Sequence, residues 1–406
     1  MPNSADPRLL WTPPQALQDA SNMRAYMDWL AERRGLCMDT YDDLWRWSVD
    51  HIEEFWATLW DYFRIRSFAP YDLVLSGHAM PGARWFVGAQ INYAEHVFRN
   101  ASADHPAMVF QSERQPLVDI SWTELERQVA AVAACLRGLG VVAGDRVVGY
   151  VPNTPQALVA FLAAASLGAV WSSCSPDFGS PSVIDRFAQI APKVLFAIDG
   201  YQYGGRPFDR RPAVAELQAA LPSLERTIFI PYLDAAAAPT GLREITTWAE
   251  ALATPGALQF TPVPFDHPLW VLYSSGTTGL PKPIVQSQGG ILIQHLKELH
   301  LHLNLKAGDR FFWFSTTGWM MWNLLVGGLL VGATVVSYDG SPGFPDMGAL
   351  WRLAEQSGTT FFGTSAGYIT ALMKTEIAPG RDYDLRRLIG LGSTGSPLSP
   401  EGFEWV

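Results

Sequence analysis

The stretch from Tyr273 to Lys282, YSSGTTGLPK, gathers hydroxyl groups, two glycines and a lysine in ten consecutive residues. Glycine lets the backbone approach a ligand closely, and clustered N–H and hydroxyl groups form a concavity that suits anions. The stretch therefore predicts a loop that wraps a polyphosphate. The residues expected to contact the phosphates are Ser274, Ser275, Gly276, Thr277, Thr278, Gly279 and Lys282.

Two other interpretations of this loop are less favoured. A P-loop requires the order Gly-x-x-x-x-Gly-Lys-Ser/Thr, but the fifth residue after Gly276 is Pro281, and the lysine follows that proline. A plain surface turn would rarely follow an apolar run such as Leu269–Tyr273, which predicts a buried strand.

The loop resembles the phosphate-binding motif of the adenylate-forming acyl-CoA synthetases, and the resemblance extends over nearly the whole chain. Its continuation to Ser287, SSGTTGLPKPIVQS, resembles the acetoacetate-activating branch. The resemblance implies a ligase that converts acetoacetate and ATP to acyl-AMP and then transfers the acyl group to coenzyme A. It implies ATP, Mg²⁺ and coenzyme A as cofactors. Acetate or another short-chain acid remains an alternative substrate.

A second motif, Ser315–Asn323, follows the apolar run Phe311–Phe314. An aromatic stripe alone is more often core, but the carboxyl edge of a sheet is where open α/β folds bind ligands. The resemblance makes this turn the lining of the acyl pocket. The residues that it assigns to the pocket are Thr317, Gly318, Trp319 and Met321.

Two further motifs acquire roles from the resemblance. Gly395, Ser396 and Pro397 would pack on the adenine, although an ordinary strand-to-helix turn explains them equally well. Arg206 and Arg210 would hold the nucleotide end of coenzyme A. Arginine suits phosphate because its planar fork binds two oxygens at once, yet a solvated basic loop is about as probable.

The pentapeptide Gly363–Gly367 matches the nucleophile elbow of serine hydrolases, with Ser365 as the nucleophile. The flanking run Thr359–Phe362 predicts a strand and Tyr368–Lys374 a helix, as that motif requires. However, hydrolase triads place the histidine after the serine, and all eight histidines precede Ser365, the last being His302. A hydrolase is therefore a remote alternative.

Alternating strands and helices from about residue 98 predict an α/β fold with a helix-covered parallel sheet. Residues 20–66 show helical spacing of apolar residues and predict amphipathic helices. The resemblance divides the chain into a helical N-terminal segment, residues 1–97, and an AMP-binding adenylation domain, residues 98–406. The expected strands include Met108–Phe110, Arg146–Tyr150, Ala169–Trp171, Leu195–Ala197 and Thr227–Ile230; the expected helices include Trp122–Leu139 and Thr154–Leu167.

The composition excludes several classes of protein. The 406 residues include 29 basic and 39 acidic residues, a net charge of −10, which argues against nucleic acid as a partner. Three dispersed cysteines indicate a reducing cytoplasm, buried thiols and no metal cluster. The apolar stretch Trp319–Val336 has the length of a membrane helix, but its glycines and β-branched end predict a helix, a turn and a strand instead.

The sequence stops at Val406, soon after the proposed adenine segment. The resemblance places a ribose-binding aspartate, a hinge and a mobile catalytic lysine beyond this point, so no catalytic residue is assigned and the C-terminal cap domain is expected to be absent. A fragment with little complete turnover and poor solubility, or a nucleotide-binding module, follows as an expectation. The oligomeric state is not predicted.

Overall fold

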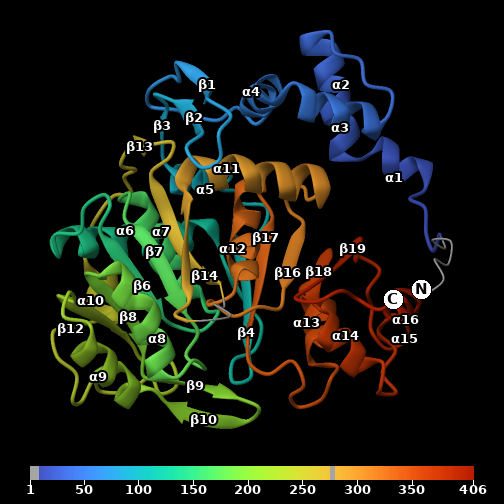
Figure 1. The fold of residues 1–406 in the computed structure, drawn as a ribbon. Helices are drawn as coiled ribbons and strands as arrows, with labels where there is room; N and C mark the ends of the chain where they lie inside the picture. The colour runs from blue at the N-terminus through green and yellow to red at the C-terminus, as the bar shows by residue number, and fades with distance from the viewer. Residues whose placement is uncertain (1–8, 275–278) are drawn as a thin grey trace.

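The structure, a computed structural model, describes residues 9–274 and 279–406 (Figure 1). Its N-terminal part is helical, as predicted. Ser21 accepts a hydrogen bond from the Arg24 backbone, and Thr40 forms a reciprocal capping box with Asp43, so two helix starts are fixed by their own side chains. These helices are α1 (Gln15–Asp19), α2 (Asn22–Arg34), α3 (Tyr41–Asp50) and α4 (Ile52–Tyr62).

Aromatic packing joins this helical part to the rest of the molecule. The Trp60 ring stacks on Phe86 with 4.6 Å between centroids. The Asn22 side chain donates to the Leu305 carbonyl at 3.0 Å and to the His300 carbonyl at 2.9 Å. The N-terminal helices therefore rest on a π-helical turn, Lys297–His302, that continues helix α11 (Gln288–Leu296).

A seven-stranded sheet forms the first half of the larger part of the molecule. Its order is β12-β11-β8-β6-β7-β14-β15, and every pairing is parallel except the hairpin β14–β15. Its strands are β12 (Ile245–Thr247), β11 (Arg226–Ile230), β8 (Val194–Ile198), β6 (Arg146–Tyr150), β7 (Val170–Cys174), β14 (Pro268–Ser274) and β15 (Lys282–Ser287).

A six-stranded sheet forms the second half, with the order β19-β18-β16-β17-β4-β5. Only the edge pair β4–β5 is antiparallel. Its strands are β19 (Gly390–Thr394), β18 (Phe361–Ser365), β16 (Arg310–Trp313), β17 (Thr334–Asp339), β4 (Met108–Ser112) and β5 (Val118–Ile120). The helix-covered sheets of the expected α/β fold are therefore confirmed, and the two large sheets are both mostly parallel.

Alternation along the strands explains how helices cover both faces of each sheet. Val148 packs with α8 and α9, whereas its neighbour Val147 joins the central core. In the same way Phe312 packs with α13 and α14, while Phe311 faces the central core. The largest cluster of buried residues thus lies between the sheets.

The remaining elements connect these layers (Figure 1). The helices are α5 (Tyr93–Phe98), α6 (Trp122–Gly138), α7 (Pro155–Ser166), α8 (Ser180–Phe187), α9 (Arg211–Ala220), α10 (Trp248–Ala253), α12 (Met320–Gly327), α13 (Ala349–Ser357), α14 (Ala366–Leu372), α15 (Pro379–Asp382) and α16 (Pro400–Trp405). The small strand pairs are β1 (Leu73–Ser76) with β2 (Arg84–Val87), β3 (Gln90–Ile91) with β13 (Val263–Pro264), and β9 (Gly200–Tyr203) with β10 (Arg206–Asp209).

The predicted helix, turn and strand within Trp319–Val336 are confirmed as α12, a short 3-10 turn and β17. Within residues 9–274 and 279–406, no helix combines the length and apolarity that crossing a membrane requires. One smaller expectation fails. Cys37 is exposed rather than buried, because the chain leaves α2 there.

Candidate active site

The described ends of the proposed phosphate loop lie at the end of the β14–β15 hairpin where the chain passes from one strand to the other. Ser274 and Lys282 are register partners there, and both are exposed. Since β14 runs parallel to β7, this hairpin end lies at the carboxyl edge of the seven-stranded sheet. Gly279 is the first residue after Ser274 that the structure describes. The predicted contacts Ser275, Gly276, Thr277 and Thr278 lie outside the described residues.

The predicted acyl-pocket turn packs tightly against a second turn, Ser175–Phe178. The Thr317 hydroxyl donates to the Val151 carbonyl at 2.6 Å, and the Thr317 carbonyl accepts from Ser173 Oγ at 2.8 Å. A methyl group at Gly318 would lie 3.3 Å from Phe178 Cζ, closer than ordinary contact allows. Thr317 and Gly318 therefore position the turn, since the Thr317 hydroxyl is engaged with the backbone.

Trp319 connects this turn to the proposed adenine segment. It is half-buried at the start of α12, and a Cβ on Gly395 would lie 3.9 Å from its Cζ2 atom. Gly395 has φ +88°, which favours glycine, and Ser396 and Pro397 beside it are exposed. The structure thus brings two separately predicted segments to one place.

Met321 behaves differently from the other residues predicted for the acyl pocket. It is 7% exposed and belongs to the central core, whereas its neighbour Met320 is 50% exposed. Successive helical residues point about 100° apart, so the two methionines lie on different faces at the start of α12.

A buried amide joins the two sheets behind the turn. The Asn153 side-chain oxygen accepts from Trp322 Nε1 at 3.0 Å and from Ser337 Oγ at 2.8 Å. Asn153 follows β6, Trp322 lies on α12, and Ser337 lies on β17. No chemical motif singles out Asn153 in the sequence; its only signal is that it is a polar residue three positions after the end of a buried strand.

The two arginines predicted for coenzyme A belong to the β9–β10 region but differ in surroundings. Arg206 is exposed on β10. The Arg210 guanidinium lies over the Tyr201 ring at 5.2 Å and over Phe208 at 5.5 Å, an arrangement in which the rings favour the positive charge. Arg210 is therefore held in place, whereas Arg206 is free to reach a ligand.

Tyr150 fixes the turn that faces Arg210. Its hydroxyl hydrogen-bonds to the carbonyls of Pro176 and Phe178, at 3.0 and 2.8 Å. Burial raises the pKa of Tyr150 to about 12, while the nearby Arg210 opposes that rise. The phenol therefore keeps its proton at neutral pH and can donate to these carbonyls.

The carboxyl edges of the two sheets enclose a cavity of about 100 Å³ between these segments. Tyr201 lines it together with residues from the turns and from the end of β17. The lining includes Asn153, Ser175, Asp177, Phe314, Ser315, Thr316 and Asp339.

Asp339 is the titratable group in this cavity with the clearest shift. Burial raises its pKa to about 7, the charges of Glu113 and Asp177 add to the rise, and a hydrogen bond from the Tyr232 hydroxyl at 2.7 Å opposes it. The carboxyl therefore exchanges its proton near neutral pH. The strand-end position of Asp339 gives no hint of this in the sequence.

The Asp339→Asn variant should change how stability depends on pH. Between about pH 4 and pH 7 the folded chain keeps a proton that the unfolded chain releases, so the free energy of unfolding falls as pH rises. The amide removes this fall. We expect the variant to match the wild type at pH 4 and to exceed it by about 4 kcal/mol at pH 8, measured by urea unfolding. An equal difference at both pH values would contradict the assignment.

Ser365, the nucleophile of the alternative hydrolase, lies at the end of β18 as the N-cap of α14. Its Oγ accepts from the Tyr368 backbone N–H at 3.2 Å. The strand begins at Phe361, two residues later than predicted, and extends through the Gly-x-Ser segment. The observed geometry gives Ser365 a capping role.

Comparison with known proteins assigns the family. Residues 95–406 match the family described as AMP-binding enzyme, and residues 41–97 match the acetyl-coenzyme A synthetase N-terminus. The chain is 43% identical over 404 residues to an acetoacetyl-coenzyme A synthetase of Rhizobium meliloti (strain 1021), covering 98% of this chain and 61% of the relative. It is 42% identical over 384 residues to an acetoacetyl-CoA synthetase of Danio rerio, covering 92% and 57%.

A solved structure supports the same assignment. The acetoacetyl-CoA synthetase from Streptomyces lividans superposes with a TM-score of 0.95 at 52% identity, over 98% of this chain and 62% of that one. The chain thus spans about three fifths of the length of the relatives it matches. These matches confirm both the resemblance inferred from the phosphate-loop motif and the α/β fold. With the family description covering residues 95–406, the chain belongs to the AMP-binding enzyme family.

Proposed function

We propose that this chain carries the adenylating part of an ATP-dependent ligase that activates acetoacetate as acyl-AMP and transfers it to coenzyme A. The observation that carries the proposal is the Ser274–Lys282 pair at the mouth of the β14–β15 hairpin, at a carboxyl edge where α/β sheets bind ligands. Residues 1–97 are the proposed N-terminal segment and residues 98–406 the adenylation domain. The proposed location is the cytoplasm.

The proposed reaction has two steps. A carboxylate oxygen of the acid attacks the α-phosphorus of ATP, and the bond to pyrophosphate breaks. The sulfur of coenzyme A then attacks the acyl carbon, the bond to AMP breaks, and the thiol proton is lost. Both steps depend on positioning and on neutralising phosphate charge. Mg²⁺, when bound, would neutralise phosphate oxygens further.

The residues of the chain would position these substrates. Lys282 with Ser274 and the loop from Ser275 to Gly279 would hold the phosphates, and Gly395, Ser396 and Pro397 would pack on the adenine. The described members of this set, Ser274, Gly279, Lys282, Gly395, Ser396 and Pro397, are exposed, which leaves them accessible to a nucleotide. Arg206 and Arg210 would bind the phosphates of coenzyme A. Thr317 and Gly318 would fix the acyl turn, with Trp319 as its wall, and the buried Met321 would support the turn from the core side.

The direct test is acetoacetate-dependent exchange of pyrophosphate into ATP, measured on the protein at the length that its source cells make. Exchange should be faster with acetoacetate than with acetate or butyrate, and added coenzyme A should yield the thioester. Binding of ATP without any exchange would instead make the protein a nucleotide-binding module. Faster exchange with acetate would replace acetoacetate as the substrate.

Replacing Trp319 by Ala should widen the acyl pocket. We expect the ratio of kcat/KM for hexanoate to kcat/KM for acetoacetate to rise about tenfold. The reason is that each additional methylene accommodated in an apolar pocket contributes about 1 kcal/mol. The measurement is pyrophosphate exchange with both acids. The matched control is Trp45→Ala, a tryptophan that is 55% exposed on α3. An unchanged ratio would remove Trp319 from the pocket.

A further inference from the structure

A second, larger cavity lies where the two sheets meet on the side of β4 and β5. Its volume is about 470 Å³, within the range of about 300–1,000 Å³ that small-molecule sites occupy. Its walls come from the β4–β5 hairpin, the start of α7, the segment after β11, and α10. The residues that matter below are Glu113, Arg114, Val118, Gln156, Tyr232, Leu233, Trp248 and Asp339.

The position of this cavity in the fold is one that favours ligand binding. From β6 the chain passes through α7 to β7 on one side, while β8 on the other side of β6 leads to β11. The connections of β6 and β8 therefore leave in opposite directions, and open α/β sheets bind ligands at such a switch point. Gln156 at the start of α7 and Tyr232 after β11 both line the cavity.

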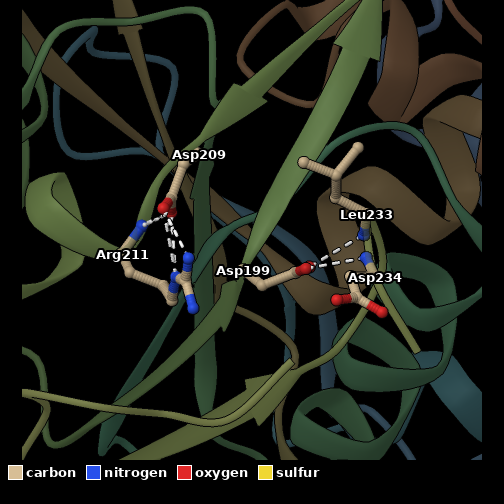
Figure 2. A network of polar contacts seen from close by, with 5 residues as sticks. All are labelled: Asp199, Asp209, Arg211, Leu233 and Asp234. Carbon is tan, nitrogen blue, oxygen red and sulfur yellow. Dashed lines mark hydrogen bonds and ion pairs between the residues drawn. The ribbon is translucent and has the colours of Figure 1, made fainter. Parts of the chain in front are cut away.

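The walls of the cavity are held by their own hydrogen bonds. The Glu113 carboxylate accepts from the backbone N–H groups of Gly204, Gly205 and Ser341 at 2.7–2.8 Å. The Arg114 guanidinium donates to the Leu233 carbonyl. The Asp199 carboxylate accepts from the N–H groups of Leu233 and Asp234 (Figure 2). The cavity is thus framed by fixed backbone, which preorganises it for a ligand.

Two acceptors stand out among the polar groups of the wall. The Gln156 Oε1 atom is buried and has no hydrogen-bond partner among the described residues, an arrangement that costs free energy unless something donates to it. The Asp339 carboxyl lines this cavity as well as the 100 Å³ cavity described above. Asp339 and Glu113 together place two acidic groups in the wall of this cavity. The wall contains one arginine, Arg114, whose guanidinium already donates to the Leu233 carbonyl. An anionic ligand would therefore be repelled.

From this geometry we propose that the 470 Å³ cavity is a second small-molecule site that takes a primary amine or a carboxamide on a compact apolar body. The N–H groups of the ligand donate to Gln156 Oε1 and to the Asp339 carboxyl. Val118 and Trp248 contact its apolar body. Because Asp339 also lines the 100 Å³ cavity beside the turn that contains Ser315 and Thr316, a ligand in the larger cavity contacts a wall that the two cavities share.

The experiment is a ligand-observed NMR titration of the 406-residue chain at pH 8 with benzylamine, benzamide and benzoate. We expect saturable binding of the amine and the amide, and at least tenfold weaker binding of benzoate. Gln156→Met should weaken benzamide about three- to tenfold, the loss expected for one neutral hydrogen bond. Asp339→Asn should weaken benzylamine tenfold or more, since that contact is charge-assisted.

Three controls keep the outcome decisive. Gln15→Met, an exposed glutamine on α1, should leave all three affinities unchanged. Val118→Trp should block the cavity and abolish binding. If Asp339→Asn does not fold, Val118→Trp and Gln156→Met still test the proposal. Tight benzoate binding, affinities that no cavity variant alters, or no saturable binding below about 10 mM would each overturn the proposal.

Discussion

The Lys282→Ala variant is expected to lose about a hundredfold in kcat/KM for ATP in pyrophosphate exchange, the size of effect seen when one preorganised charge-stabilising group is removed. Lys282 is exposed and paired in register with Ser274 at the mouth of the hairpin. Its ammonium is exposed and can neutralise phosphate charge that grows in the transition state. Lys282→Arg should recover only part of the loss, because a planar guanidinium replaces a point charge.

The matched control for this variant is Lys306→Ala. Lys306 is also exposed, but it lies before β16, at the amino end of the six-stranded sheet, where it donates to the Ala20 carbonyl at 2.8 Å. Exchange should be unchanged in that variant, and both proteins should unfold within about 0.5 kcal/mol of the wild type. Equal exchange rates for Lys282→Ala and the wild type would contradict the proposal that this end of the β14–β15 hairpin binds the phosphates of ATP.

Local patterns in the sequence predicted the elements of the fold well. The run Leu269–Tyr273 lies inside β14, Arg146–Tyr150 is β6, and Trp122–Leu139 differs from α6 by one residue at its end. Hydrophobic periodicity and capping residues determine such elements locally. The same patterns exclude a membrane helix at Trp319–Val336, because glycines divide that stretch.

Pairing between distant strands could not be predicted in this way. Nothing in the sequence indicates that β4 would join β17 in a second sheet, since that pairing depends on contacts more than two hundred residues apart, such as Met108 with Val335. The sequence also does not indicate that β15 pairs with β14 in the antiparallel direction. Asn153 and Asp339 matter because the sheets meet at their positions. Only the folded chain reveals residues of that kind.

The resemblance assigned roles to segments of the chain, and the folded structure adds how the side chains in those segments are held. Trp319 and Gly395, 76 positions apart in the sequence, do approach each other. By contrast, the Thr317 hydroxyl donates a hydrogen bond to the Val151 carbonyl, and the Met321 side chain is buried in the core. Motifs specify where a turn forms, whereas the direction of each side chain depends on the packing around it.

The Asp199→Ala variant is expected to lose about 4 kcal/mol of unfolding free energy, a large share of the stability of a typical domain. Asp199 is 4% exposed, and its carboxylate accepts from three successive backbone N–H groups, those of Tyr232, Leu233 and Asp234, at 2.6–2.8 Å. Alanine leaves these donors without a partner, at a cost of about 1–3 kcal/mol each before the segment relaxes. Urea unfolding measures the loss.

Figure 2 also shows the matched control, because Asp209 forms an ion pair with Arg211 close to Asp199 in the chain. Both side chains of that pair are well exposed, and such pairs contribute about 0–1 kcal/mol, so Asp209→Ala should lose less than about 1 kcal/mol. The two variants remove the same charge from sites of different burial. Asp199 is buried and accepts hydrogen bonds from three backbone N–H groups, whereas the exposed Asp209 competes with water for Arg211. Equal losses in the two variants would show that the segment after β11 is held by something other than Asp199. In that case the wall of the larger cavity would owe its rigidity to the Arg114–Leu233 contact instead.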